Sequence, residues 1–317
     1  MFGFYIIVFI ISCALLYFAG EWLVKSLIRI ARFLGWREFV VAFLIVAFTT
    51  SISNLFVGIS SALHRIPQLS FADVVGANVV DLTLAIAIAT LINKGIPAKS
   101  RLIQNSAIFT IFIAILPLLL ILDGTLGRGD GLILIFNFGF YCAWLFSKEE
   151  RFKKVYNDKV SIVKGFKTFL KDLGMVILGV LMLIAAAEGI VRSAAFFAQN
   201  LKVPLALIGI LIVGLGTSLP EIYFVITSAR KKENWLILGN LMGSVIIVST
   251  LVLGLVALIC PIEITDFSSF AIARIFLIFS AISFLFFVRS GQKITKKEAL
   301  FLLSIYILFI SVEILTH

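Results

Sequence analysis

Apolar residues fill long stretches of this 317-residue chain, and polar residues gather in the short segments between them. Ten of these stretches approach or exceed the roughly 18 residues that an α-helix needs to cross about 30 Å of hydrocarbon. The pattern therefore predicts an all-α chain with ten membrane-spanning helices. They are expected at residues 3–24, 39–63, 71–93, 103–122, 131–147, 172–195, 204–229, 235–260, 270–288 and 298–315.

Composition agrees with this interpretation and excludes an ordinary soluble domain. Hydrophobic residues make up 61% of the chain and charged residues only 14%, far from the usual globular balance. The sequence predicts an integral membrane protein whose first apolar stretch stays in the mature chain, because no basic segment precedes it and no cleavage site follows it. The three cysteines offer neither a disulfide framework nor a metal-ligand spacing, and no cofactor is expected.

Basic residues are concentrated in every second loop, so the formal charge of +10 is explained by membrane topology and does not require a nucleic-acid partner. Numbering the loops by the ten predicted helices places 22 of the 27 Lys and Arg residues on one side of the membrane. Only Arg65, Arg128, Arg192, Lys202 and Arg274 fall on the other side. Because cytoplasmic loops carry the excess of Lys and Arg, we expect both termini to lie outside.

The one long polar stretch divides the chain into two halves. Residues 148–171 hold eight Lys and Arg residues and are too few to fold as a domain. We expect them to form a cytoplasmic linker between a five-helix repeat at residues 1–147 and a second five-helix repeat at residues 172–317.

The two halves are similar in sequence when the chain is shifted by 167 residues. Between residues 21–92 and 188–259, 19 of 72 positions are identical without a gap, and the matches include Thr50 with Thr217 and Ser51 with Ser218. Because each half has an odd number of helices, the second enters the membrane in the opposite sense. The chain is thus predicted to be an inverted repeat, an architecture whose substrate site lies near the midplane between interrupted helices.

Two acidic residues lie well inside predicted helices, away from their ends, and mark a candidate site. Glu221 follows the segment GLGTSLP, whose glycines and proline suit an interrupted helix, and Asp81 lies within GANVVDLTLAIAIA. Acids within the bilayer are rare, costly and by default functional. The sequence offers neither the nucleophile and base nor the metal cluster of a membrane enzyme. We therefore expect a cation site rather than a catalytic one.

These motifs resemble a known family. The segment GTSLPE at 216–221, its counterpart TTSISN at 49–54, and the Gly-Ala and Gly-Ser pairs at 76–77 and 243–244 resemble the alpha repeats of the cation/calcium exchanger superfamily, which includes the sodium/calcium exchangers. The resemblance implies a secondary antiporter that exchanges Ca²⁺ for Na⁺ or H⁺ by alternating access, with cytoplasmic Ca²⁺ exported. The site residues that it implies are Glu221, Asp81, Asn54, Thr50, Ser51, Thr217, Ser218 and Ser244.

Three positions depart from the family pattern. The family usually has glutamate where Asn54 stands, Asp81 replaces an asparagine or aspartate, and Val248 removes a polar ligand. Asp81 and Glu221 still supply two negative charges, enough to neutralise one divalent ion, and neutral oxygens complete a shell of the kind that Ca²⁺ prefers. The coupling ion is left open between Na⁺ and a proton taken up by one of these acids.

The sequence also allows other interpretations. A monovalent cation/H⁺ exchanger and a cation-binding sensor that transports nothing both fit the missing acid at Asn54. The hydroxyls also suit bonds to their own helices, and Asn54 suits a contact between helices. Asp73 fits a helix N-cap box with Ser70. The absence of a large regulatory domain favours a small exchanger of the prokaryotic inner membrane.

Overall fold

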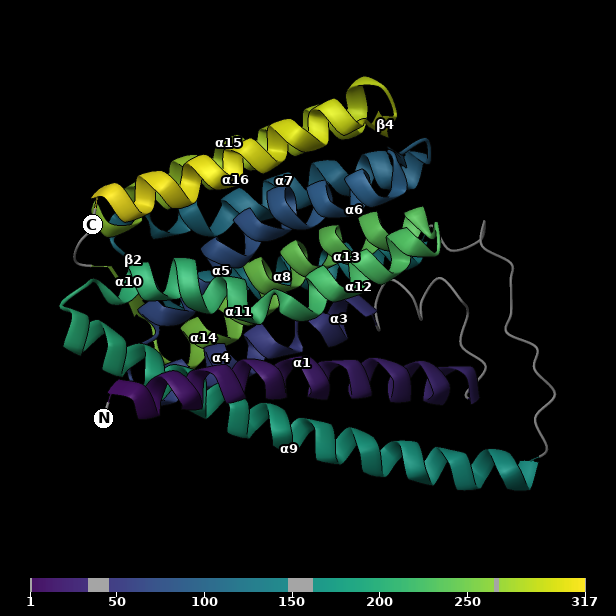
Figure 1. Cartoon of the computed structure of the whole chain (residues 1–317), viewed down its shortest axis with the longest axis horizontal. Coiled ribbons are helices and arrows are strands. Elements are labelled where there is room, and N and C mark those ends of the chain that lie inside the picture. The colour runs from purple at the N-terminus through teal and green to yellow at the C-terminus, as the bar shows by residue number, and fades with distance from the viewer. Residues whose placement is uncertain (1, 34–45, 148–161, 265–267, 317) are drawn as a thin grey trace.

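The computed structural model describes residues 2–33, 46–147, 162–264 and 268–316, which are almost entirely helical (Figure 1). The first half contains α1 (Phe2–Phe33), α3 (Ala47–Thr50), α4 (Ile52–Leu63), α5 (Gln68–Val79), η2 (Val80–Ala85), α6 (Ile86–Asn93), α7 (Arg101–Leu120), η3 (Ile121–Asp123) and α8 (Arg128–Ser147). The second half contains α9 (Ile162–Leu201), α10 (Leu205–Leu207), η5 (Ile208–Val213), α11 (Gly214–Thr217), α12 (Leu219–Arg230), α13 (Asn234–Ile247), η6 (Val248–Val252), α14 (Leu253–Ile259), α15 (Ser268–Ser290) and α16 (Lys296–Thr316).

These helices follow the predicted spans. Within the described residues, eight helical segments are long and apolar enough to cross a membrane. The other two predicted spans correspond to α3 with α4 and to α8, and residues 39–45 of the second predicted span lie outside the described residues. The sixth span differs from the prediction, because α9 is already helical from Ile162, ten residues before the expected start.

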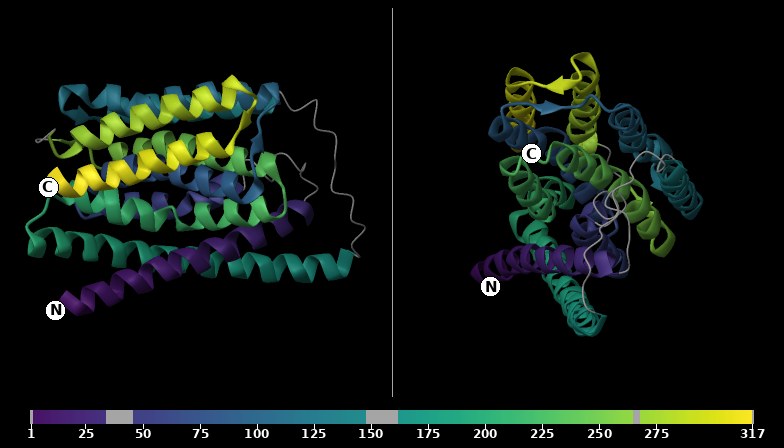
Figure 2. Two further views of the ribbon diagram at one scale, coloured as in Figure 1. Left: turned by 45° about the horizontal axis from the view of Figure 1, so that its top comes forward. Right: turned by 90° about the vertical axis from the view of Figure 1, so that its right-hand side faces the viewer.

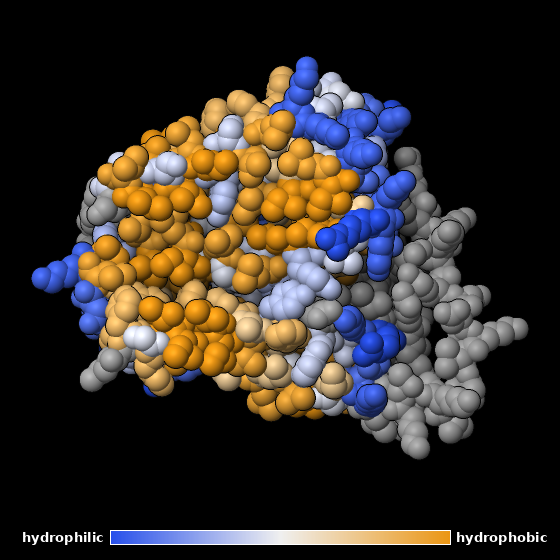
Figure 3. Space-filling model, viewed as in Figure 1, coloured by the Kyte–Doolittle hydropathy of each residue, from blue (hydrophilic) through white to orange (hydrophobic). Residues whose placement is uncertain are grey.

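The surface of the bundle suits a lipid environment. Large apolar side chains are exposed along its sides, among them Phe136 at 73% and Ile275 at 66%, whereas monomeric soluble proteins rarely expose broad apolar patches. In Figure 3 a wide hydrophobic band covers the middle of the visible face, and hydrophilic side chains gather toward its two ends. Both chain termini lie at the same end of the bundle (Figure 1). The protein is therefore an integral membrane protein.

Two short pairs of strands show the symmetry of the fold. Strand β1 (Ile96–Pro97) pairs antiparallel with β4 (Lys293–Ile294), and β2 (Thr125–Leu126) pairs antiparallel with β3 (Ile262–Glu263). A shift of 167 residues carries β1 onto the β3 region and β2 onto the β4 region, so each strand pair joins one half to the other. The two pairs are thus related by the internal repeat that the sequence predicts.

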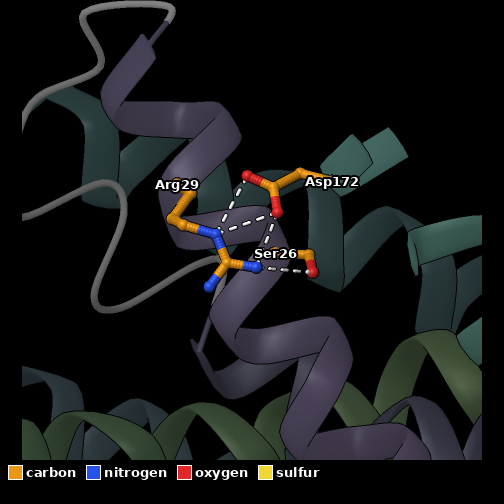
Figure 4. Close-up of polar contacts among 3 residues, drawn as sticks. All are labelled: Ser26, Arg29 and Asp172. Atoms are coloured by element: carbon orange, nitrogen blue, oxygen red, sulfur yellow. Dashed lines mark hydrogen bonds and ion pairs between the residues drawn. The ribbon is translucent and has the colours of Figure 1, made fainter. Parts of the chain in front are cut away.

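Helices α1 and α9 pack along one another on one side of the bundle (Figures 1 and 2). Near one end of this helix pair, the guanidinium of Arg29 on α1 forms an ion pair with the carboxylate of Asp172 on α9. Nε donates to Oδ1 and Oδ2 at 2.9 Å each, and a terminal nitrogen donates to Oδ1 at 2.6 Å and to the Ser26 hydroxyl at 3.2 Å (Figure 4). This ion pair joins the two helices directly.

The interior of the bundle is formed by two equivalent segments, one from each half. In the most apolar stretches of Gln68–Asn93 and Asn234–Ile259, 78% of the residues are buried, against 33% in Lys171–Leu201 of α9 and 17% in Phe2–Gly20 of α1. Close packing brings Gly76 of α5 against the backbone of η5, where an added Cβ would lie 2.1 Å from the Ile210 carbonyl oxygen. The polar side chains in the interior of these segments, Asp73, Asp81, Asn240 and Ser244, are consequently shielded from both lipid and water.

Candidate functional site

The second and seventh spans are interrupted at equivalent serines. Ser51 separates α3 from α4 with φ −77° and ψ −2°, and Ser218 separates α11 from α12 with φ −82° and ψ −2°. In the second half the break is followed by Pro220, which lacks an N–H and is tolerated in the first turn of a helix. Each break therefore begins a new helix inside the bundle, and its first turn carries Asn54 in α4 and Glu221 in α12.

The third and eighth spans are irregular at equivalent places as well. Residues 80–85 of η2 and 248–252 of η6 are π-helical, a geometry that often occurs at functional sites. Asp81 lies in η2, and the equivalent position in η6 is Val248; both are buried. The irregular backbone thus coincides with the predicted site in both halves.

Glu221, Ser244, Ser51 and Asp81 form the first polar group of the site. The Ser244 hydroxyl on α13 donates to Glu221 Oε1 at 3.3 Å and accepts from the Ser51 hydroxyl at 3.1 Å. It also interacts with Asp81. Ser244 therefore lies between the two acids that the sequence singles out.

Asp73, Thr217 and Asn54 form a second polar group. The Thr217 hydroxyl donates to Asp73 Oδ1 at 2.7 Å, and the Asn54 amide donates to Asp73 Oδ2 at 3.2 Å. The same Asn54 nitrogen lies 3.0 Å from Thr217 Oγ1. The prediction of an N-cap box for Asp73 is wrong: α5 begins at Gln68, Asp73 lies within the helix, and the Ser70 hydroxyl has no hydrogen-bond partner.

The remaining predicted hydroxyls are placed differently from one another. The Thr50 hydroxyl donates to Asn240 Oδ1 at 3.1 Å, across the interface between the two halves. The Ser218 hydroxyl instead donates to the Gly214 carbonyl of the preceding turn at 2.8 Å. All eight predicted residues are at most 2% exposed, but the Ser218 hydroxyl serves its own helix while the other seven residues meet side chains from other segments.

Three residues of this network were not predicted as site residues from the sequence. They are Asp73, Asn240 and Ser53, whose hydroxyl donates to the Thr217 carbonyl at 3.1 Å and to the Thr50 carbonyl at 3.0 Å. Ser53 occupies the position equivalent to Pro220. The internal repeat could have identified two of them, because Asp73 and Asn240 are polar residues at equivalent positions, one turn before Gly76 and Gly243.

The electrostatics of the site favour a bound cation. Asp81 Oδ1 and Glu221 Oε2 are buried without a hydrogen-bond partner, and burying a charged group without compensation is strongly unfavourable. The ion pairs recorded among the described residues join Arg29 with Asp172 and Glu188 with His64 and Arg192, and none involves the three buried acids of the site. A cation would satisfy both the charges and the open oxygen atoms.

A separate polar contact links α9 to the end of α4. Glu188 accepts hydrogen bonds from the Ser60 hydroxyl at 3.0 Å and from Arg192 at 2.6 Å, and its Oε1 lies 3.1 Å from His64 Nε2. Glu188 and Arg192 are four residues apart on α9, so their side chains lie on the same face of the helix. The side chain of Glu21, the equivalent residue of the first half, is outside the described part of the chain.

Comparisons with known proteins place this geometry in context. The model of the family described as sodium/calcium exchanger protein matches residues 4–147 and 171–315. The chain is 25% identical to the sodium/calcium exchanger MaX1 of Methanosarcina acetivorans, over 92% of this chain and 93% of that protein. It is 24% identical to the inner membrane protein YrbG of Escherichia coli, over 80% of each chain.

The fold is also that of a solved exchanger. The structure of the sodium-calcium exchanger NCX_Mj soaked with 10 mM Na⁺ and 10 mM Sr²⁺ superposes with a TM-score of 0.69 and 22% identity. The match covers 98% of this chain and 99% of that chain. Ten spans arranged as an inverted repeat agree with this similarity.

Proposed function

Since the chain belongs to the sodium/calcium exchanger protein family, a family of secondary cation antiporters, we propose that it carries Ca²⁺ and Na⁺ in opposite directions across its membrane. The transported ions bind at the buried polar site between the two halves. The residues that the sequence motifs single out are the proposed ligands of these ions, with Glu221 and Asp81 as the charged pair.

The single observation that carries the proposal is the arrangement of Glu221 and Asp81 around Ser244. Each acid is 1% exposed and keeps one oxygen without a hydrogen-bond partner. Together they carry two negative charges, which balance one Ca²⁺ ion. Because Ca²⁺ takes six to eight oxygen ligands, the hydroxyls of Ser51 and Ser244 and backbone carbonyls near the helix breaks would complete the shell.

Exchange follows if Na⁺ competes for the same oxygen atoms. Two Na⁺ ions neutralise the same pair of charges and accept hydroxyl and amide oxygens as ligands. Thr50, Thr217 and Asn54 would supply such neutral oxygens, and Ser218 would contribute its backbone carbonyl, since its hydroxyl is engaged with Gly214. Alternating access would then expose the site to one side at a time as α1 and α9 slide together over the remaining helices.

The distribution of basic residues supports an orientation. Both termini lie at one end of the bundle (Figure 1), and the sequence predicts that 22 of the 27 Lys and Arg residues lie in or beside the loops of the opposite side. We propose that both termini lie outside and that residues 148–171 form a cytoplasmic linker between the halves 1–147 and 172–317. A small exchanger of this kind suits a prokaryotic inner membrane.

One observation favours a second candidate, monovalent cation/H⁺ exchange. Val248 is fully buried at the position equivalent to Asp81, and Asn54 is neutral at the position equivalent to Glu221. Each of these two pairs of equivalent positions, 54 with 221 and 81 with 248, therefore carries one acid instead of two. A monovalent exchanger would tolerate this asymmetry, because one ion needs one charge.

Flux measurements separate these functions. Purified protein in liposomes is exposed to external radioactive Ca²⁺ while an outward Na⁺, Li⁺ or proton gradient is imposed in turn. Ca²⁺ uptake driven by the Na⁺ gradient supports the proposed exchange, and uptake driven by the proton gradient names H⁺ as the coupling ion instead. If no gradient moves Ca²⁺ but Na⁺ or Li⁺ moves against protons, the second candidate replaces the first. Protein that binds cations and moves none is a sensor.

A further inference from the structure

An exchange of acid and amide between the two halves singles out Asp73. In the second half the acid Glu221 lies on α12 and the amide Asn240 on α13. At the equivalent positions of the first half the amide Asn54 lies on α4 and the acid Asp73 on α5. Each half therefore keeps one acid and one amide at this pair of positions, but the negative charge has moved to the other helix.

The contacts of Asp73 match those of its counterpart. Thr217 donates its hydroxyl to Asp73 Oδ1 at 2.7 Å, and in the opposite half Thr50 donates its hydroxyl to Asn240 Oδ1 at 3.1 Å. The contact between halves is thus made equally well by an amide. A purely structural role for residue 73 would not require an acid.

The charge of Asp73 is only partly compensated. The side chain is 0% exposed, and its two oxygens each accept one hydrogen bond from a neutral group, Thr217 or Asn54. A carboxylate oxygen has room for a further partner, and neutral donors leave a net charge in the interior, which is far costlier to bury than a neutral polar group. The recorded ion pairs of the described residues do not reach Asp73.

The position of Asp73 is separate from that of the Asp81 and Glu221 pair. Within the described ranges, no three acidic, histidine or cysteine side chains are grouped closely enough to hold one metal ion. Asp73 is nevertheless near enough for its charge to act on Glu221. The oxygen atoms of Asp81 and Glu221 that have no hydrogen-bond partner mark one cation position. Asp73, with the Thr217 hydroxyl and the Asn54 amide beside it, marks another.

Resting on the proposed function, we infer that Asp73, Thr217 and Asn54 form a second cation position, which takes a monovalent ion such as Na⁺ beside the Ca²⁺ position. One negative charge with neutral oxygens matches the charge of a monovalent ion. The substitution of Asn54 for an acid is thereby compensated within the same half, because Asp73 supplies the charge that the α4 position lacks.

Two variants test this inference against the structural alternative. Asp73→Asn removes the charge but keeps an oxygen for Thr217, as Asn240 does for Thr50. The double variant Asn54→Glu/Asp73→Asn gives the first half the arrangement that the second half has in Glu221 and Asn240. Asp130→Asn, at the start of α8, is the matched control, and melting temperatures in detergent verify that each variant is folded.

The readouts are the Na⁺ and Ca²⁺ concentrations that give half-maximal exchange. Asp73→Asn is expected to raise the Na⁺ requirement about tenfold or more, with the Ca²⁺ requirement changed much less, since tenfold corresponds to the loss of one favourable ion contact. The double variant should recover much of the Na⁺ response. Unchanged Na⁺ dependence in folded Asp73→Asn overturns the inference, as does an equal rise in both requirements. Absence of exchange in the unaltered protein instead refutes the proposed function.

Discussion

Removal of the ion pair between α1 and α9 is expected to destabilise the protein in a way that the second partner can partly reverse. Asp172 is 3% exposed and receives three contacts from Arg29 of 2.6–2.9 Å, whereas the Arg29 side chain is 45% exposed. Arg29→Ala therefore leaves a buried carboxylate without its cation. Asp172→Ala leaves only a guanidinium that can turn to water or lipid headgroups.

The expected loss of stability depends on this difference in exposure between Arg29 and Asp172. Breaking a fully buried pair costs about 3–5 kcal/mol, but water reaches the exposed side of Arg29 and weakens the interaction, so we expect about 1–3 kcal/mol for Arg29→Ala. Asp172→Ala should cost less. In the double variant no buried charge remains, and the two effects should fail to add by about 1 kcal/mol or more.

The assay is a double-mutant cycle on purified protein in detergent. Thermal or denaturant unfolding is followed by the loss of the monodisperse peak in size-exclusion chromatography, with the exposed Arg289→Ala as control. Arg29→Ala should lower the apparent Tm by roughly 2–6 °C, and the control should leave it nearly unchanged. Strictly additive losses in the double variant would refute the reasoning, because they would mean that Arg29 and Asp172 stabilise the protein independently.

Three further outcomes are expected. Gly76→Ala should lower the melting temperature through overpacking of about 1–3 kcal/mol against the Ile210 carbonyl, whereas Gly139→Ala, where an added Cβ meets nothing within 4 Å, should not. Ser244→Ala should raise the Ca²⁺ concentration for half-maximal uptake about fivefold, since it removes the hydrogen bond of about 1 kcal/mol that the Ser244 hydroxyl donates to Glu221; an unchanged value would exclude Ser244 from the site. Glu188→Gln should alter the turnover rate up to about fivefold with Ca²⁺ affinity unchanged, because its half-exposed contacts join α9 to α4 and not to the ion; flux assays over a range of Ca²⁺ concentrations measure both values.

Much of the architecture could be predicted because membrane helices are specified by length and hydropathy. The ten apolar stretches and the shift of 167 residues indicate the inverted repeat, and the strand pairs β1–β4 and β2–β3 bear its symmetry out. The start of α9 could not be placed, because residues 162–171 alternate lysines with apolar residues and are too polar to count as part of a span. That segment is helical beyond the apolar stretch.

The parts of the site where a sequence motif specifies the backbone could be predicted. The residues that enter the site only through packing between helices could not. GTSLPE indicated a helix break, and the break at Ser218 recurs at Ser51, although TTSISN lacks the glycine and proline. The spacing of Ser70 and Asp73 predicts a helix cap instead of a site residue. Its contacts with Thr217 and Asn54 depend on how α5 packs against α4 and α11, and sequence spacing carries no information on such packing.

The most direct test of the proposed exchange is Na⁺-driven Ca²⁺ uptake into proteoliposomes, compared between the unaltered protein and Glu221→Gln. Both proteins are loaded with Na⁺, diluted into Na⁺-free medium with radioactive Ca²⁺, and compared with liposomes that have equal Na⁺ inside and outside. The account predicts uptake only with the gradient and only with Glu221 present, in variants with matching melting temperatures. Uptake that persists undiminished in Glu221→Gln would contradict it.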